Sequence, residues 1–291
     1  MKPAAFAYHD PTSLAEASAL LARHENARLL AGGQSLIPMM NFRYVTPDHL
    51  IDLNTVAGLS GIHASGETLR LGAMTRQREV EFSAEIGRAC PILIEALAQV
   101  GHRQTRNRGT IGGSLCHLDP AAELANIAAL HDATLEAESA RGRRRLGFAE
   151  FAHGYMTHAL AQDEILTAIA LEPWPRGHGY AFLELARRHG DFAIVAVGAL
   201  LALDARGNIA RAALAISGLG ALPVRATKAQ DLLRGAKPAR DAFLAAAAEA
   251  GKLEAMSDAY VSAAYRQHLA RTLTQRALER AAQRAAEQAR A

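Results

Sequence analysis

The sequence predicts an α+β protein built from more than one domain, and three observations support this. The chain has 291 residues, which suffices for about two domains with sizeable cores. Three consecutive strand-like segments between residues 180 and 217 precede alanine-rich helical segments, an order typical of α+β modules and not of alternating βαβ units. A Pro/Gly cluster at residues 172–179, EPWPRGHG, comes just before these strands and is the clearest candidate domain boundary.

The segments before this boundary alternate between short helices and strands. The capping box SLAE at Ser13 begins one helix, and Pro91 begins a second, strongly apolar helix, PILIEALAQV. Asp119 followed by Pro120 predicts the N-cap and first turn of a third helix. Residues 101–109, GHRQTRNRG, are expected to form a polar loop. Strands are expected in the segments ARLL, HLIDL, TLRLGA and ILTAIAL, which begin at residues 27, 49, 68 and 165.

The chain after the boundary predicts a three-stranded antiparallel sheet followed by helices. The strands cover residues 180–188, 192–204 and 209–217, and the turn sequence DARGN joins the last two as a hairpin. Helices are expected from residue 226 onward, over 238–250 and over 260–288.

Charge and hydropathy argue against two classes of partner. The formal net charge is +3, which is too small to indicate binding to nucleic acid. The N-terminus has no apolar core of a signal peptide. The longest apolar stretch, residues 192–203, is too short to span a bilayer.

Cysteine and histidine usage bounds the redox and metal chemistry. Cys90 and Cys116 are the only cysteines, which argues against a disulfide scaffold and for a reducing cytoplasm. Two thiols are also too few to hold an iron–sulfur cluster within this chain. Although the chain has 12 histidines, it contains neither CxxC nor HExxH, so no metal centre is expected within it.

Two similar glycine pairs are the main candidates for a binding site. AGGQSL spans residues 31–36 and TIGGSL spans residues 110–115. Successive backbone N–H groups in such turns converge on anions, and a diphosphate needs several donors. The backbone amides of both loops are therefore the expected donors, with the Ser35 and Ser114 hydroxyls assisting. The alternative is that both pairs are simply tight turns.

Other candidate residues each allow a structural and a functional interpretation. His117 and Asp119 form either a catalytic pair or a helix entry in which Asp119 is the cap. Glu123 is placed to accept hydrogen bonds from a ribose. Phe192 belongs either to the core or against a flat ring on which it stacks.

Two further segments are ambiguous in the same way. His102, Arg103, Arg106 and Arg108 could attract a phosphate or an acidic partner surface, or form a solvated basic loop. The segment AISGLGALP at residues 215–223 begins like GxGxxG but has Pro223 in place of the third glycine, which favours the exit of a hairpin.

Four segments resemble one known family in order along nearly the whole chain. They are LLAGGQSLIPMMNFR, TRNRGTIGGSLCHLDPAAEL, DEILTAIALEPWP and GHGYAFLELARRHGDFAIVAV. They resemble the medium, FAD-binding subunit of molybdenum hydroxylases, in the carbon monoxide dehydrogenase flavoprotein-subunit family, which is similar to xanthine dehydrogenase. The resemblance implies an α+β fold of the vanillyl-alcohol-oxidase (PCMH) type. It also implies two FAD-binding subdomains, residues 1–57 and 58–176, and a C-terminal flavoprotein domain, residues 177–291.

The same resemblance implies FAD as the cofactor of this chain and no catalytic side chain or metal ligand of its own. The two glycine loops would bind the FAD diphosphate, Glu123 would hold the ribose or nearby polar groups, and Leu166 and Phe192 would lie near the ring systems. The implied cofactor-binding residues are Leu30, Ala31, Gly32, Gly33, Gln34, Ser35, Leu36, Gly109, Thr110, Ile111, Gly112, Gly113, Ser114, His117, Asp119, Glu123, Leu166 and Phe192.

The resemblance finally implies partners and a role in electron transfer. A large subunit with the molybdenum cofactor and a small subunit with [2Fe-2S] clusters would form a cytoplasmic dimer of heterotrimers with this chain. The chain would pass electrons from those clusters to an external acceptor. Two alternatives remain, a self-sufficient FAD-dependent oxidase or dehydrogenase of the same fold, and an assembly protein that has lost FAD. The sequence does not identify the substrate of the complex or the acceptor.

Overall fold

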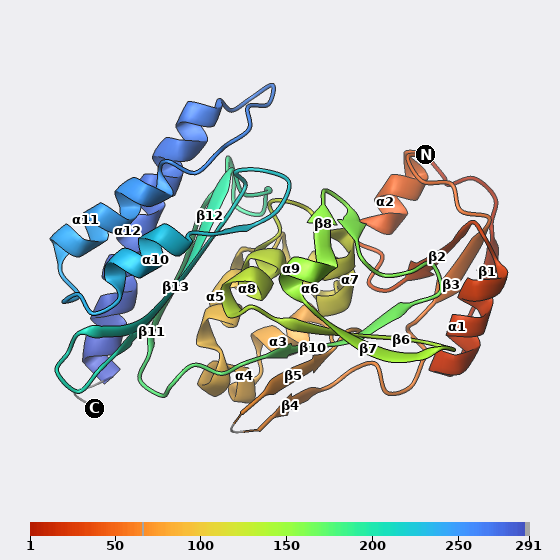
Figure 1. The fold of residues 1–291 in the computed structure, drawn as a ribbon. Helices are drawn as coiled ribbons and strands as arrows, with labels where there is room; N and C mark the ends of the chain where they lie inside the picture. The colour runs from red at the N-terminus through yellow and green to blue at the C-terminus, as the bar shows by residue number, and fades with distance from the viewer. Residues whose placement is uncertain (66, 289–291) are drawn as a thin grey trace.

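The computed structural model describes residues 1–65 and 67–288, and its three main sheets follow one another along the molecule (Figure 1). The first sheet is parallel, in the order β1-β3-β2, and His49 pairs with Ala7 on one side and Ala27 on the other. Ser13 caps the helix packed against it, accepting a hydrogen bond from the Glu16 amide at 3.2 Å. The elements are β1 (Ala7–His9), α1 (Leu14–Arg23), β2 (Ala27–Leu30), α2 (Leu36–Asn41) and β3 (His49–Asp52).

The second sheet is antiparallel and mixes strands from distant parts of the chain, in the order β4-β5-β10-β6-β7. A bulge interrupts the pairing of β10 with β6 between Leu166 and Ala168. Its strands are β4 (Ile62–Ala64), β5 (Leu69–Gly72), β6 (Thr134–Ser139), β7 (Gly142–Gly147) and β10 (Ile165–Leu171). The accompanying elements are α3 (Gln77–Glu81), α4 (Ala84–Ala89), α5 (Pro91–Gln99), α6 (Arg103–Arg108), α7 (Ile111–His117), α8 (Glu123–His131), α9 (Phe148–Phe151), β8 (Ala152–Gly154) and β9 (Thr157–His158).

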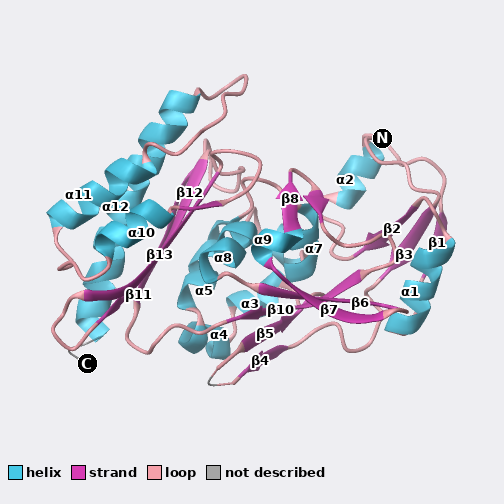
Figure 2. Ribbon diagram, viewed as in Figure 1, coloured by secondary structure: helices cyan, strands magenta, loops and turns pink. Residues whose placement is uncertain are grey.

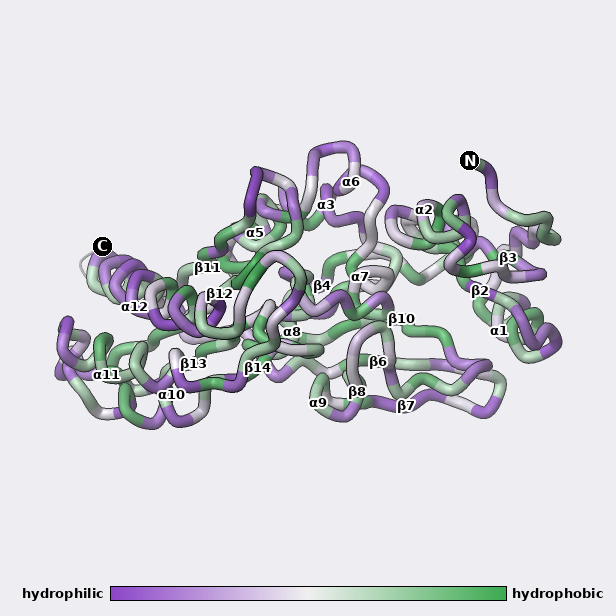
Figure 3. Tube along the Cα trace, turned by 90° about the horizontal axis from the view of Figure 1, so that it is seen from above, coloured by the Kyte–Doolittle hydropathy of each residue, from purple (hydrophilic) through white to green (hydrophobic). Residues whose placement is uncertain are grey.

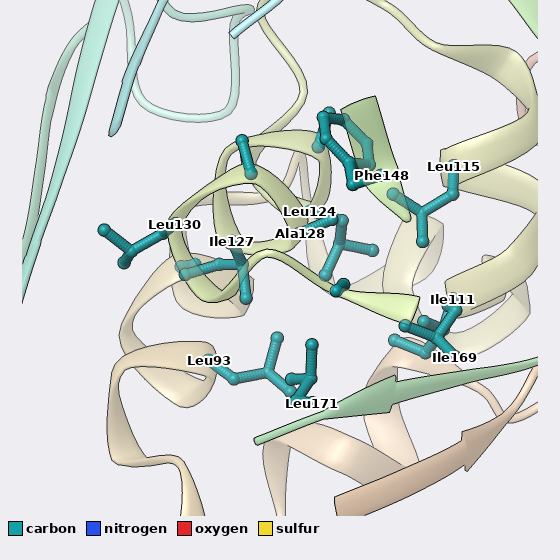
Figure 4. Packing of buried hydrophobic residues seen from close by; sticks show 14 of the residues in the cluster. Leu93, Ile111, Leu115, Leu124, Ile127, Ala128, Leu130, Phe148, Ile169 and Leu171 are labelled. Atoms are coloured by element: carbon teal, nitrogen blue, oxygen red, sulfur yellow. The ribbon is translucent and has the colours of Figure 1, made fainter. Parts of the chain in front are cut away.

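The main hydrophobic core lies between β10 and helices α5, α7 and α8. Leu93 of α5, Leu115 of α7, Ile127 of α8 and Ile169 of β10 all belong to it (Figure 4). Every residue of α8 is buried, as expected of a helix that is enclosed by other elements on all sides.

The C-terminal sheet has four strands, so the prediction of three was wrong. They are β11 (Gly179–Leu185), β12 (Val195–Leu203), β13 (Ile209–Ser217) and β14 (Val224–Arg225), all antiparallel. The fourth strand is two residues long, too short to show an alternating pattern in the sequence. The segment AISGLGALP is the exit from β13 into this strand, as predicted, with Gly218 at φ 82°.

Strand β12 is buried on both faces, and its alternate residues enter different cores. Val197 and Ala199 pack with helices α10 to α12, whereas Ala196 and Leu200 join the core around α5 and α8. A strand covered on both faces reads as a continuous apolar run, which explains the sequence VAVGALLAL. Figure 3 shows β12 and β10 as largely hydrophobic segments, in contrast to the many hydrophilic residues of α12.

The C-terminal helices cover the outer face of this sheet. They are α10 (Thr227–Leu233), α11 (Arg240–Ala250) and α12 (Ala263–Gln288). A side chain at Gly179 would collide with the Ala281 carbonyl group, so α12 crosses β11 where glycine permits the closest approach. Across the part of the chain that the structure describes, no helix combines the length and apolarity required to cross a membrane.

Two predicted local features differ from the structure (Figure 2). Residues 101–109 were expected to form a loop but contain α6, whose mostly polar residues show no apolar helical period. Asp119 is not a helix N-cap, because α8 begins at Glu123 after Ala122. Instead its Oδ1 accepts a hydrogen bond from the Ala121 amide at 2.8 Å and stabilises the turn before the helix.

Each main sheet falls within one of the three predicted domain ranges. The main core nevertheless extends from the second sheet into the C-terminal sheet, where it includes Phe182, Ala213 and Ala215. The division at residues 57 and 176 therefore stays a prediction.

Candidate functional site

A cleft of about 1440 Å³ is lined by segments from all three parts of the chain. The predicted site residues line it, with the exceptions of Leu30 and Ile111. Ile111 is only 2 % exposed and belongs to the main core. The fold thus brings residues 31–36 and 109–114 into one wall although they are far apart in sequence.

The first glycine loop presents free backbone donors. It connects β2 to α2, and Gly33 adopts φ 71°, a conformation that favours glycine. Among the described residues, no acceptor pairs with the amides of residues 32–36. Ser35 stands at the N-cap of α2 but makes no capping bond, so its hydroxyl group is also available. This loop has the donors that a diphosphate requires.

The second glycine pair is organised differently from the prediction. It lies in the first turn of α7, and its amides already have acceptors within the protein. Gly112 donates to the Ala73 carbonyl oxygen at 2.8 Å, Gly113 to the Thr110 hydroxyl at 3.1 Å, and Ser114 to the Thr110 carbonyl at 3.2 Å. The half-buried Ser114 side chain is therefore the main donor of this segment that faces the cleft.

Close backbone packing explains two of the glycines. A Cβ atom at Gly32 would lie 2.8 Å from the Gly109 Cα atom, because the two loops touch there. A Cβ atom at Gly112 would lie 2.5 Å from the Ala73 Cβ atom, at the end of β5. The tight-packing interpretation therefore holds for these two positions, and it also explains how the loops come to form one wall.

A side-chain bridge outside the cleft fixes the two loops relative to each other. Asn54 Nδ2 donates to the Ala31 carbonyl oxygen at 3.1 Å, and Asn54 Oδ1 accepts from the Arg76 guanidinium group. Arg76 also donates to the Arg108 carbonyl oxygen, next to the second loop. The sequence does not reveal this bridge, because neither residue belongs to a recognisable motif.

Acidic groups form another part of the cleft wall. Glu123, the first residue of α8, is 8 % exposed, and burial raises the pKa of its carboxyl group to about 8, helped by Glu184 and Asp119. Burial also raises the pKa of Glu184 to about 7. Burial lowers the pKa of His117, so this imidazole is neutral near pH 7. Among the described residues, no hydrogen bond joins His117 to Asp119, which gives the catalytic-pair interpretation no support.

The two apolar residues that were predicted to lie near the ring systems differ in exposure. Leu166, next to the β10 bulge, is almost fully buried, whereas Phe192 is 72 % exposed. The core interpretation of Phe192 was therefore wrong: β12 begins at Val195, and Phe192 lies in the preceding loop. That loop also brings Arg187 and Arg188 to the cleft, two cationic residues that no sequence motif had indicated.

The basic residues of the arginine-rich segment do not line the cleft, and neither cysteine supplies a charged group to it. Arg106 is buried and paired with Glu81 at 2.9 Å, while His102, Arg103 and Arg108 are exposed and do not line the cleft. Both cysteines are free, and burial raises the pKa of each thiol to about 12. Cys116 lines the cleft, yet its thiol stays protonated.

The shape and donor set of this cleft fit FAD. Its volume exceeds the roughly 300–1,000 Å³ of pockets for drug-sized ligands, as a long dinucleotide requires. One wall supplies a loop of free amides for a diphosphate, and other walls supply carboxyl groups and apolar side chains for the ribose and rings.

The chain belongs to the flavoprotein family that this fold and cleft define. The family described as "FAD binding domain in molybdopterin dehydrogenase" matches residues 4–174, and "CO dehydrogenase flavoprotein C-terminal domain" matches residues 180–281. The chain is thus an FAD-binding medium subunit of the molybdenum hydroxylase type, and an oxidoreductase subunit.

Relatives match over nearly their full length. The alpha subunit of the 6-hydroxypseudooxynicotine dehydrogenase complex of Paenarthrobacter nicotinovorans is 38% identical, over 97% of this chain and 96% of that protein. The carbon monoxide dehydrogenase medium chain of Afipia carboxidovorans is 37% identical, over 97% and 98%. The structure of quinoline 2-oxidoreductase from Pseudomonas putida 86 superposes with a TM-score of 0.93 at 37% sequence identity, covering 98% of this chain and 99% of that one.

Proposed function

We propose that this subunit receives electrons from iron–sulfur clusters of a partner subunit and passes them to an external acceptor. The observation that carries the proposal is the first glycine loop, whose free amides open into a cleft large enough for FAD. Bound FAD would supply the redox chemistry, and the protein would supply binding, orientation and a defined electrostatic surrounding.

The described residues divide the binding of FAD among them. The amides of residues 32–36 and the Ser35 and Ser114 hydroxyls hold the diphosphate, and Arg187 and Arg188 add positive charge to the cleft. Glu123 and Asp119 form hydrogen bonds with the polar part of the cofactor. Leu166 and the exposed ring of Phe192 contact its flat ring systems.

The partners in this proposal are a large subunit with the molybdenum cofactor and a small subunit with [2Fe-2S] clusters. The names of the relatives, a complex subunit and a medium chain, support assembly with other chains. We propose a dimer of such heterotrimers in the cytoplasm, where the free thiols of Cys90 and Cys116 stay reduced.

Co-purification and anaerobic titration test the function. The chain should be isolated with its partners, its flavin identified after denaturation, and its visible spectrum followed while substrate is added to the complex. We expect FAD in this subunit and bleaching of the flavin band only when the partner subunits are present. Absence of FAD after reconstitution would contradict the proposal, and so would oxygen consumption by the isolated subunit with a small organic substrate, which would establish the self-sufficient oxidase instead.

A further inference from the structure

Three histidines from separate elements converge at the first sheet. His9 ends β1, His49 begins β3, and His24 is the C-cap of α1. Ala7 of β1 and Ala27 of β2 pair with His49 from opposite sides. His9 lies two residues after Ala7, and His24 lies three residues before Ala27. The parallel sheet thus gathers side chains that are 15 and 25 residues apart in the sequence, a spacing that no local motif reveals.

The three imidazoles are close enough to share one ion. Their nearest ligand nitrogens all lie within 4.8 Å of one another, and His9 Nε2 is 3.0 Å from His49 Nδ1. The rings of His24 and His49 are stacked with centroids 3.7 Å apart. Zinc–nitrogen bonds of about 2.0–2.1 Å in a tetrahedron place ligand nitrogens roughly 3.3 Å apart. To bind one ion, the stacked rings of His24 and His49 must turn so that both nitrogens point at it, and coordination replaces the hydrogen bond between His9 and His49.

The electrostatic surroundings keep the imidazoles available as ligands. Among the described residues, no carboxylate forms a salt bridge with any of the three rings. Their ring nitrogens are thus not held by acidic partners, and imidazole nitrogens are common ligands of transition metals.

We propose that His9, His24 and His49 bind one divalent transition-metal ion, such as Zn²⁺, in a site separate from the flavin cleft. Three imidazoles suit zinc, copper, nickel and cobalt, and a water molecule completes the coordination. The ion joins β1, the end of α1 and the start of β3. The segment that follows His24 contributes Glu25, Ala27 and Arg28 to the cleft wall, so the ion also stiffens that wall.

Calorimetric titration of the full-length chain with Zn²⁺, after removal of metals by a chelator, tests this site. We expect one equivalent of Zn²⁺ to bind and to raise the Tm. The variants His24→Ala and His49→Gln should each weaken binding at least tenfold and remove the rise in Tm. His63→Ala, at an exposed histidine on β4, is the matched control and should bind as the unaltered chain does.

A second readout reports on the ligands themselves. Co²⁺ added in place of Zn²⁺ should give the visible bands of a four-coordinate, nitrogen-ligated ion, and these bands should disappear in His24→Ala and His49→Gln. Circular dichroism of the metal-free variants establishes that they fold. If folded variants retain the full affinity for Zn²⁺, or if the unaltered chain binds none, the three rings merely stack and the proposed site does not exist.

Discussion

Among the residues of the cleft, Glu123 has the clearest effect on the stability of the folded chain, through its carboxyl group. Its pKa is about 8 in the folded chain, against an ordinary value of 4.5, mainly because of burial. Between these two values the folded protein keeps a proton that the unfolded chain releases. The free energy of unfolding therefore falls as the pH rises from about 4.5 to about 8, by at most about 1.4 kcal/mol per pH unit.

Urea unfolding of the FAD-free chain across this pH range measures the effect. Glu123→Gln removes the titrating group, so its unfolding midpoint should depend less on pH and exceed that of the unaltered chain at pH 8. Glu254→Gln, at an exposed position, should follow the unaltered chain at every pH. Parallel pH profiles for the unaltered chain and Glu123→Gln would show that Glu123 does not titrate in this way.

Ser114 and Gly112 are two residues apart but have different roles. The Ser114 hydroxyl faces the cleft, whereas Gly112 packs against Ala73. A hydrogen bond to a charged group is worth about 1.5–3 kcal/mol, so Ser114→Ala should weaken FAD binding at least about tenfold with little change in stability. Gly112→Ala should instead cost about 1–3 kcal/mol of stability through overpacking.

Flavin fluorescence titration and urea unfolding of both variants separate these effects. The result that would contradict the assignment is a Ser114→Ala chain that retains FAD as tightly as before. Equal stability of Gly112→Ala would show that the contact with Ala73 relaxes without cost.

At the residue scale the sequence predicted which positions meet but not what each of them does. The repeated glycine pairs located the cleft, because glycine is required where chains approach closely and where φ is positive. The sequence could not distinguish these causes. Gly33 has a positive φ, while Gly32 and Gly112 are set by tertiary contacts with Gly109 and Ala73.

At the scale of elements, the two loops depend on the bridge formed by Asn54 and Arg76. This bridge joins Ala31, just after β2, to Arg108 at the end of α6, and neither Asn54 nor Arg76 lines the cleft. Removing it frees one loop relative to the other, so the cofactor must order them on binding. Arg76→Met should therefore weaken FAD binding, by roughly tenfold if one charge-assisted hydrogen bond is lost.

The control for this variant is Arg78→Met, which lies in α3 two residues after Arg76 and pairs with Glu81, not with either loop. FAD affinity of the two variants, measured side by side, tests the role of the bridge. Equal affinities would mean that the contact between Gly32 and Gly109 alone positions the loops.

Element boundaries were predictable where one face is apolar and local signals agree. The N-cap at Ser13 and the strands β10 and β13 are examples, whereas β12 begins three residues later than predicted. Helix α6 and strand β14 were missed because tertiary contacts specify them. Arg106 of α6 is anchored by Glu81, and β14 exists only as the partner of β13.

At the scale of the whole molecule, Asn126 connects the FAD-binding part to the C-terminal sheet. It is fully buried in α8, and its Nδ2 donates to the Ser217 hydroxyl at 2.9 Å and the Ala215 carbonyl at 3.1 Å. Because the core is continuous across this contact, the two parts should unfold together. Asn126→Ala leaves buried acceptors unpaired, which costs about 1–3 kcal/mol, and weakens the coupling between them.

Differential scanning calorimetry reports this coupling directly. The unaltered chain should show one transition, and Asn126→Ala should show a lower Tm with a broadened or split transition. Ser217→Ala, which removes a single partner and keeps Asn126, should have a smaller effect on Tm and leave one transition. If Asn126→Ala lowers Tm with a transition as sharp as before, the apolar contacts of α5 and α8 with the C-terminal sheet are sufficient to couple the two parts, and Asn126 contributes to stability alone.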